Sequence, residues 1–178
     1  MPTLVAPFAV RQKVENAVLL FLQSQIAACT PTALDTPTVV TLGIRQAVAS
    51  LGFPRVVIEG LRAALIESVD GLFDVTLTIF VATKIGEIGA TEANYQTAAN
   101  LHTARAGLID SWLTPSPPDA PSPINVFIGT GQSALNGALP LTGLIVHAMY
   151  LSDQQSEQIG EHWTDTLTYS AICQLQPE

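Results

Sequence analysis

The chain has 178 residues, and 12% of them are charged, about half of the roughly 25% that is typical of soluble domains. Ser, Thr, Asn and Gln are together twice as numerous as the charged residues, and Thr is the commonest of the four. A surface rich in Thr and poor in charge is typical of strands and of contacts between subunits. Since no apolar run approaches the roughly 20 residues of a membrane-spanning helix and the first ten residues lack the basic region of a signal peptide, we expect a cytosolic protein without membrane contact.

The charges are unevenly distributed along the chain. All seven Lys and Arg lie at or before Arg105, whereas seven acids and no base follow it. Because contacts with phosphate need Lys or Arg, this distribution argues against nucleic-acid binding by the C-terminal part. The simplest interpretation is a solvated acidic face that improves solubility.

Two helices are predicted in the first third of the chain. Apolar residues at helical spacing predict one over residues 14–29, where Thr30-Pro31 ends it, and another over residues 42–51, where Gly52 ends it. The first is apolar on most sides, which predicts that it is buried between layers or against another chain.

A long β-hairpin is predicted over residues 56–85, with Asp70-Gly71 as a two-residue turn. After the turn, apolar and polar residues alternate, as in a strand with one buried face. The first arm is also compatible with a helix, and a two-residue turn would place Glu67 opposite Asp74.

A long helix is predicted from Thr91, which can cap it, to Leu113. Arg105 and Asp110 are expected on or near its exposed side. Its expected core stripe consists of Tyr95, Ala98, Leu101, Leu108 and Trp112.

Five prolines lie in the segment 115–123, which predicts an extended surface connection. A docking peptide of the PxxP type is the alternative for this segment. Beyond it, the sequence predicts a short strand over residues 124–128 and a central strand over residues 144–151.

The last predicted strand alternates most regularly. Its apolar set is Trp163, Leu167, Tyr169, Ala171 and Cys173, and its hydroxyl set is Thr164, Thr166, Thr168 and Ser170. One face would pack on a core, and the other would form a ladder of hydroxyls. Together the elements predict a single α+β domain over residues 1–178, with a mainly antiparallel sheet and a long hairpin packed against two or three helices.

No catalytic, cofactor-binding or metal-binding residues are predicted, and we expect the protein not to be an enzyme. His102, His147 and His162 lie outside any known nucleophile or zinc motif, and His147 is expected to be a hydrogen-bonded core histidine. Cys29 and Cys173 lack a metal-ligand spacing and are expected to be inert buried thiols.

The order of the predicted elements along the chain is similar to that of a known protein family. An apolar N-terminal helix is followed by a hairpin, a helix, a Leu-Asn loop, a glycine-led strand and a closing strand that contains Trp. The segments concerned after the first helix are 74–81, 97–105, 134–137, 143–151 and 162–169. This order resembles the tail-terminator proteins of long-tailed bacteriophages, small α+β proteins that form a ring at the end of the tail tube, and the likeness spans roughly residues 14–173.

The resemblance implies a structural virion protein of the tail or neck, assembled in the host cytoplasm. It would form a homo-oligomeric ring, with six copies expected, between the tail tube protein and the neck or connector proteins, and genomic DNA would pass through without specific binding. An acidic lumen would keep the DNA from adhering. Candidate residues for the lumen or the interfaces are Glu87, Glu92, Asp110, Asp119, Glu157, Glu161, Thr164, Thr166 and Thr168.

Three alternatives remain at this point. The N-terminal extension and the segment 115–123 are not required by the terminator pattern, which leaves another phage neck or head-completion protein open. A small-molecule enzyme would need a pocket that gathers one of the histidines with a carboxylate. A generic binding module would use the segment 115–123 as its docking peptide.

Overall fold

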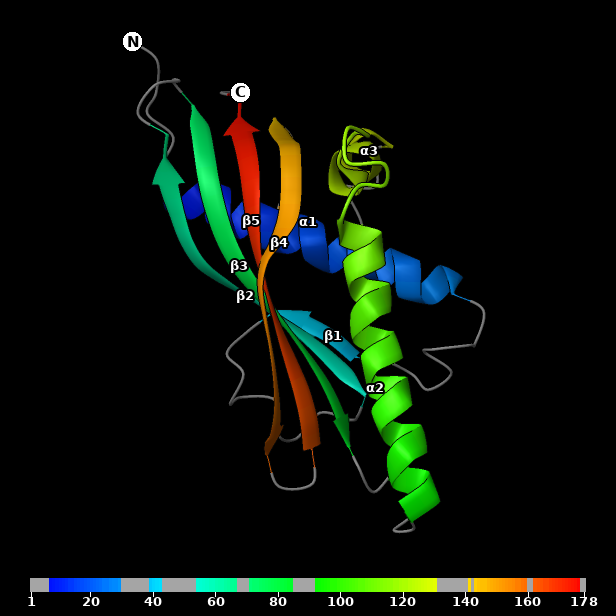
Figure 1. Ribbon diagram of the computed structural model, residues 1–178. Helices are drawn as coiled ribbons and strands as arrows, with labels where there is room; N and C mark the ends of the chain where they lie inside the picture. The colour runs from blue at the N-terminus through cyan, green and yellow to red at the C-terminus, as the bar shows by residue number, and fades with distance from the viewer. Residues whose placement is uncertain are drawn as a thin grey trace.

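The computed structural model describes residues 7–29, 39–42, 54–66, 71–84, 92–130, 141, 143–159 and 162–176, and these form three helices and one five-stranded sheet (Figure 1). This is the predicted α+β class, with a mainly antiparallel sheet. The elements are α1 (Pro7–Ala28), β1 (Val39–Leu42), β2 (Arg55–Leu65), β3 (Leu72–Lys84), α2 (Glu92–Leu113), α3 (Pro123–Gly129), β4 (Leu144–Ile159) and β5 (His162–Leu175). Among the described residues, no helix is long and apolar enough to span a membrane.

The sheet has the strand order β1-β2-β3-β5-β4, in which β1 and β2 are parallel and the other pairs are antiparallel. The predicted β2–β3 hairpin is confirmed, but its turn is longer than two residues. The Ile66 N–H donates to the Leu72 carbonyl, and Ala64 instead of Glu67 lies opposite Asp74. Because two strands joined by a longer loop pair in a different register, the expected pairing of Glu67 with Asp74 was wrong.

One face of the sheet, here called the helix face, packs under all three helices. Its central residues pair across β3 and β5, with Leu77 opposite Tyr169 and Ile79 opposite Leu167, and all four are buried. In Figure 1, α1 crosses behind the strands. It begins at Pro7, seven residues before the predicted start, and its buried residues join the same core.

The opposite face, here called the polar face, carries the predicted hydroxyl ladder. Its members on the two central strands are Thr76, Thr78, Thr164, Thr166, Thr168 and Ser170. Val57 and Phe80 form a small separate buried cluster on this face. On the two central strands, hydroxyls thus form most of the polar face.

α2 turns a different stripe to the core from the one predicted. The side chains buried along it are His102, Arg105, Ala106, Ile109 and Leu113. Leu101, Leu108 and Trp112 are half-buried, and Arg105, expected on the exposed side, is 1% exposed. The reason is a hydrogen bond from Arg105 to Thr83 on β3, which fixes the rotation of the helix. Thr91, the expected cap, lies outside the described residues.

The strand predicted over residues 124–128 is instead the helix α3. Pro123 occupies its first turn, where proline is favoured, and Ile124 is buried in the main core. Phe127 packs edge-on against Phe21 of α1, with ring centroids 5.6 Å apart. Apolar contacts at helical spacing thus override the strand propensity of this segment. The segment 115–123 connects α2 to α3, and its prolines 117 and 118 are exposed.

The strand predicted over residues 144–151 is the first half of β4, which extends to Ile159 and lies at the edge of the sheet. His147 is exposed, not in the core, because the pairing with β5 shifts between Val146 and Ala148 and leaves His147 as an extra residue. Residues 42–51 were predicted as a helix, but Leu42 ends β1 and the rest lie outside the described residues.

Substitution of Gly60 tests the close contact between α1 and β2, and substitution of a second glycine provides the control. The Gly60 N–H donates to Glu15 Oε1 at 2.8 Å, and a Cβ on Gly60 would lie 2.0 Å from that oxygen and 2.8 Å from Arg11 Cγ. We expect Gly60→Ala to lower the free energy of unfolding by about 1–3 kcal/mol, measured by urea denaturation. Gly107→Ala is the matched control: the space around Gly107 on α2 is open, so it should stabilise by about 0.5–1 kcal/mol. Equal effects at both positions would contradict this account.

Candidate functional site

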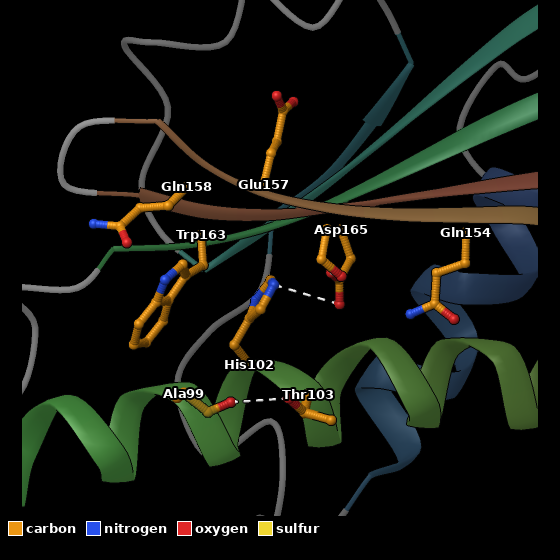
Figure 2. Close-up of a pocket in the computed structure, with 9 residues that line it drawn as sticks. Ala99, His102, Thr103, Gln154, Glu157, Gln158, Trp163 and Asp165 are labelled. Atoms are coloured by element: carbon orange, nitrogen blue, oxygen red, sulfur yellow. Dashed lines mark hydrogen bonds and ion pairs between the residues drawn. The ribbon is translucent and has the colours of Figure 1, made fainter.

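A pocket of about 400 Å³ lies between α2 and the part of the sheet where β4 ends and β5 begins (Figure 2). It is open to solvent on one side and combines polar side chains with one indole. Its lining residues are Ala99, His102, Thr103, Gln154, Ser156, Glu157, Gln158, Trp163 and Asp165. Figure 2 shows His102 of α2 and Asp165 of β5 pointing toward each other at its floor, whereas Glu157 points away from α2.

A buried imidazole and carboxylate form the centre of this pocket. His102 Nε2 lies 3.4 Å from Asp165 Oδ2, and both residues are nearly inaccessible to solvent. Ser156 of β4 donates a short hydrogen bond to Asp165 Oδ1. The Trp163 ring lies beside the imidazole, with centroids 6.3 Å apart. Asp165 therefore links β4, β5 and α2.

Thr83 of β3 joins this centre to Arg105. Arg105 Nη1 donates to Thr83 Oγ1 at 3.0 Å, and His102 Nδ1 lies 3.0 Å from the same oxygen. Thr83 Oγ1 therefore lies within hydrogen-bond distance of both side chains, while His102 Nε2 faces Asp165. The five residues His102, Arg105, Thr83, Asp165 and Ser156 are called the polar cluster below.

The pKa of Asp165 is lower than that of an ordinary aspartate. Burial alone would raise it, but the hydrogen bonds from His102 and Ser156 and the charge of His102 outweigh that effect. The carboxylate form is therefore the one that the folded protein stabilises.

The arrangement of the polar cluster does not match a nucleophilic catalytic site. Nucleophile activation needs direct contact between a hydroxyl and its base. The hydroxyl in contact with His102 is that of Thr83, which is 1% exposed and therefore shielded from a substrate. The other hydroxyl, that of Ser156, contacts Asp165, so the carboxylate lies between it and His102. Within the described ranges, no group of three or more His, Cys, Asp or Glu side chains could hold a metal ion. The geometry favours a cluster that ties α2 to the sheet.

The other two histidines lie apart from the polar cluster. His147 is exposed on β4, with Nε2 3.4 Å from Gln174 Oε1. His162 begins β5 on the polar face, opposite Lys84 and Ile159. His102 is the histidine that lines the described pocket, where it lies against Asp165.

The candidate lumen and interface residues do not form one site. Asp119 and Glu157 are exposed, Thr166 and Thr168 are half-buried on the polar face, and Thr164 is buried there. Asp110 points inward and accepts hydrogen bonds from Tyr169 and Thr114, each at 2.9 Å. The side chain of Glu92 and all of Glu87 and Glu161 lie outside the described part of the chain.

The polar cluster was missed at the level of sequence, although one signal pointed to it. Asp165 is separated by an even number of residues from Trp163, Leu167 and Tyr169. Alternation along β5 therefore places this acid on the same side as those residues, the helix face. A buried acid requires a partner, and the facing helix offers His102 and Arg105. Pairing that acid with those residues would have identified the cluster.

No protein-family model matches the chain, and no curated protein matches it.

Asp165→Asn tests the polar cluster. The lowered pKa means that Asp165 contributes stability above the ordinary carboxyl pKa of about 3.9 and loses it as the pH falls through its lowered value. We expect the variant to lose about 1–3 kcal/mol of unfolding free energy at neutral pH, and we expect this deficit to shrink in acid. Asp153→Asn, on the exposed part of β4, is the control and should change stability by less than about 0.5 kcal/mol. A deficit that stays constant down to acid pH would contradict the assignment.

The two thiols should differ in reactivity. Burial and the nearby Asp74 carboxylate raise the pKa of Cys173 to about 12, whereas Cys29 is half-buried. Near pH 8.5, about the ordinary thiol pKa, we expect a maleimide to modify Cys29 in the native protein and Cys173 only after unfolding. Mass spectrometry of native and urea-unfolded protein measures this, with Cys29→Ser as the control. Labelling of Cys173 at the rate of Cys29 would show that the sheet opens readily.

Proposed function

We propose that this protein is a structural virion protein, a tail terminator of a long-tailed bacteriophage. Its copies form a ring, expected to be six-fold, that ends the tail tube and joins it to the neck or connector, and DNA passes through the ring. The observation that carries the proposal is the negative charge of the β4–β5 hairpin. The β4–β5 hairpin bears Asp153 and Glu157 on its polar face, and residues 144–175 include no Lys or Arg.

The order of the folded elements supports this proposal. The helix α1, the β2–β3 hairpin, the helix α2 and the β4–β5 hairpin follow one another as in the family that the sequence resembles. Both hairpins lie in one sheet, under helices that cover a single face. Among the described elements, such a subunit has parts of two strand edges left for neighbours.

The distribution of charge supports a lumen that does not retain DNA. Non-specific affinity for duplex DNA comes mainly from Lys and Arg that displace counterions from phosphates. The described exposed or half-buried cations lie on α1, on β2 and at the end of β3, where Lys84 is opposite His162 of β5, and β4 and β5 themselves contain no Lys or Arg. In the proposed ring, the β4–β5 half with Asp153, Glu157 and the half-buried Thr166 and Thr168 faces DNA or a neighbour, and the passing DNA meets acids and hydroxyls.

Solution mass and electron microscopy test the proposed function. We expect light scattering to give a mass several times the 18.8 kDa of the chain and negative-stain images to show rings. Gel shift at physiological salt should show no binding of duplex DNA, since the net charge is −8. A protein that stays monomeric, alone and with tail tube and neck proteins, would overturn the proposal, and tight DNA binding would contradict the lumen that it implies.

A further inference from the structure

Two strands of the sheet have an open edge in the described part of the chain. β4 pairs with β5 on one side and with no described strand on the other; near its start the Val146 N–H donates to Asn125 of α3, and residues 147–159 follow. β2 pairs with β1 only over residues 55–58, and the Gly60 N–H donates to Glu15 of α1, so residues 61–65 have an open outer side among the described elements. Open edges present unpaired N–H and C=O groups, which readily pair with another strand.

Both open edges expose large apolar side chains. Leu61 is 52% exposed and Leu65 is 45% exposed on β2, and Tyr150 is 49% exposed on β4. Leu61 and Tyr150 lie at about the same level of the sheet, because one row of paired residues runs from Arg62, next to Leu61, through Thr76 and Ser170 to Tyr150. Leu65 lies three rows away, opposite Phe73 and on the helix face. Apolar groups on an open strand edge are a liability for a monomer, unless a partner covers them.

The directions of the two strands fit each other. β2 is antiparallel to β3, β3 to β5 and β5 to β4, so β2 and β4 run in opposite directions. If a second copy is rotated about an axis along the strands, its β2 edge meets the β4 edge of the first in the antiparallel sense. A contact between two different edges is heterologous, and repeated rotation closes it into a ring.

The charges and composition of the edges also match. Arg62 is exposed on the β2 edge, and Asp153 is exposed on β4, two rows from Tyr150 on the same face. Natural edge strands are usually short or guarded by charged residues, Pro or bulges. β4 contains no Lys or Pro and exceeds the usual five or six residues, and its guards are two bulges, at residues 147 and 152, and the acids Asp153 and Glu157.

We propose that β4 of one copy pairs antiparallel with residues 61–65 of β2 in the next copy, so that the sheet continues from subunit to subunit. Tyr150 then covers the neighbour's Leu61 and Arg62, and Asp153 lies near that arginine. The occupant is a second copy of this chain. The inference rests on the proposed function, which supplies the neighbouring subunits, and it identifies the surface through which they join.

Disulfide cross-linking tests this interface in the full chain with Cys29→Ser as background. Arg62→Cys is combined in one chain with Ala148→Cys, Tyr150→Cys or Asp153→Cys, three positions on the same face of β4. Three partners are used because ring closure can shift the register by a few residues. We expect at least one pair to give a ladder of covalent multimers on non-reducing gels. As a comparison, chains that carry Arg62→Cys alone are mixed with chains that carry Ala148→Cys, Tyr150→Cys or Asp153→Cys alone. Since each chain then has one of the two cysteines, cross-linking should stop at dimers.

Arg62→Cys with Glu157→Cys is the matched control, since residue 157 lies on the same face but about 20 Å beyond Tyr150 along the strand. Hydrogen exchange on the unsubstituted protein is the second measurement, and it does not depend on how the variants fold. We expect amides in residues 61–65 and 147–153 to exchange at least tenfold more slowly in the assembled protein than in dilute protein.

The outcomes separate the inference from the proposed function. If the protein assembles but no pair cross-links above the Glu157→Cys control and both edges exchange unchanged, this interface is wrong while the ring stands. Disulfide dimers formed by one single variant alone would indicate a two-fold contact and would also overturn the inference. If the chain remains monomeric, both the inference and the proposed function fail.

Discussion

The structure depends on one constraint, the burial of alternate residues of β3 and β5 beneath the helices. Leu77 and Tyr169, and Ile79 and Leu167, are opposite pairs whose side chains are almost completely shielded from water. Because side chains alternate along a strand, this burial forces the intervening residues onto the other face. The described helices supply no cover there, and Thr and Ser satisfy that face. The high Thr content thus follows from a sheet whose main core lies on one side, because the alternate residues of its central strands face the other side.

The polar cluster occupies the same helix face where the apolar pairs end. Val81 lies opposite Asp165, and Thr83 lies opposite Trp163, so an acid and a hydroxyl continue the register of the core. A buried carboxylate carries a large desolvation cost unless it is paired, and α2 provides the pairing groups. Because those groups suit one rotation of the helix, the cluster determines which side of α2 faces the sheet. Its contribution is specificity of packing more than net stability.

Strict alternation made the two central strands and the class of fold predictable from the sequence, because it depends on neighbours along the chain. The failures depend on contacts from elsewhere. Sequence alone predicts Arg105 to be on the surface, because its partner Thr83 lies on a distant strand. Sequence alone likewise predicts Phe127 to be in a strand, because its contact with Phe21 of α1 is not visible locally. The exposure of His147 follows from a bulge that no local pattern encodes. Of the polar cluster, Asp165 alone carried a readable signal, through its parity.

The scarcity of charge acquires a physical meaning at the edges of the sheet. Pairing two strands removes side chains at their edges from water, and each unpaired charge buried there would carry a desolvation cost. Over residues 144–159 the charged side chains are Asp153 and Glu157, and the rest are apolar or neutral polar. Such a strand can pair with a neighbour at low electrostatic cost, and Asp153 still distinguishes the basic edge of the next copy from its own. The same acids that would guide this pairing are the ones that duplex DNA would avoid, so in the proposed ring one low charge of a single sign would serve both assembly and the passage of DNA.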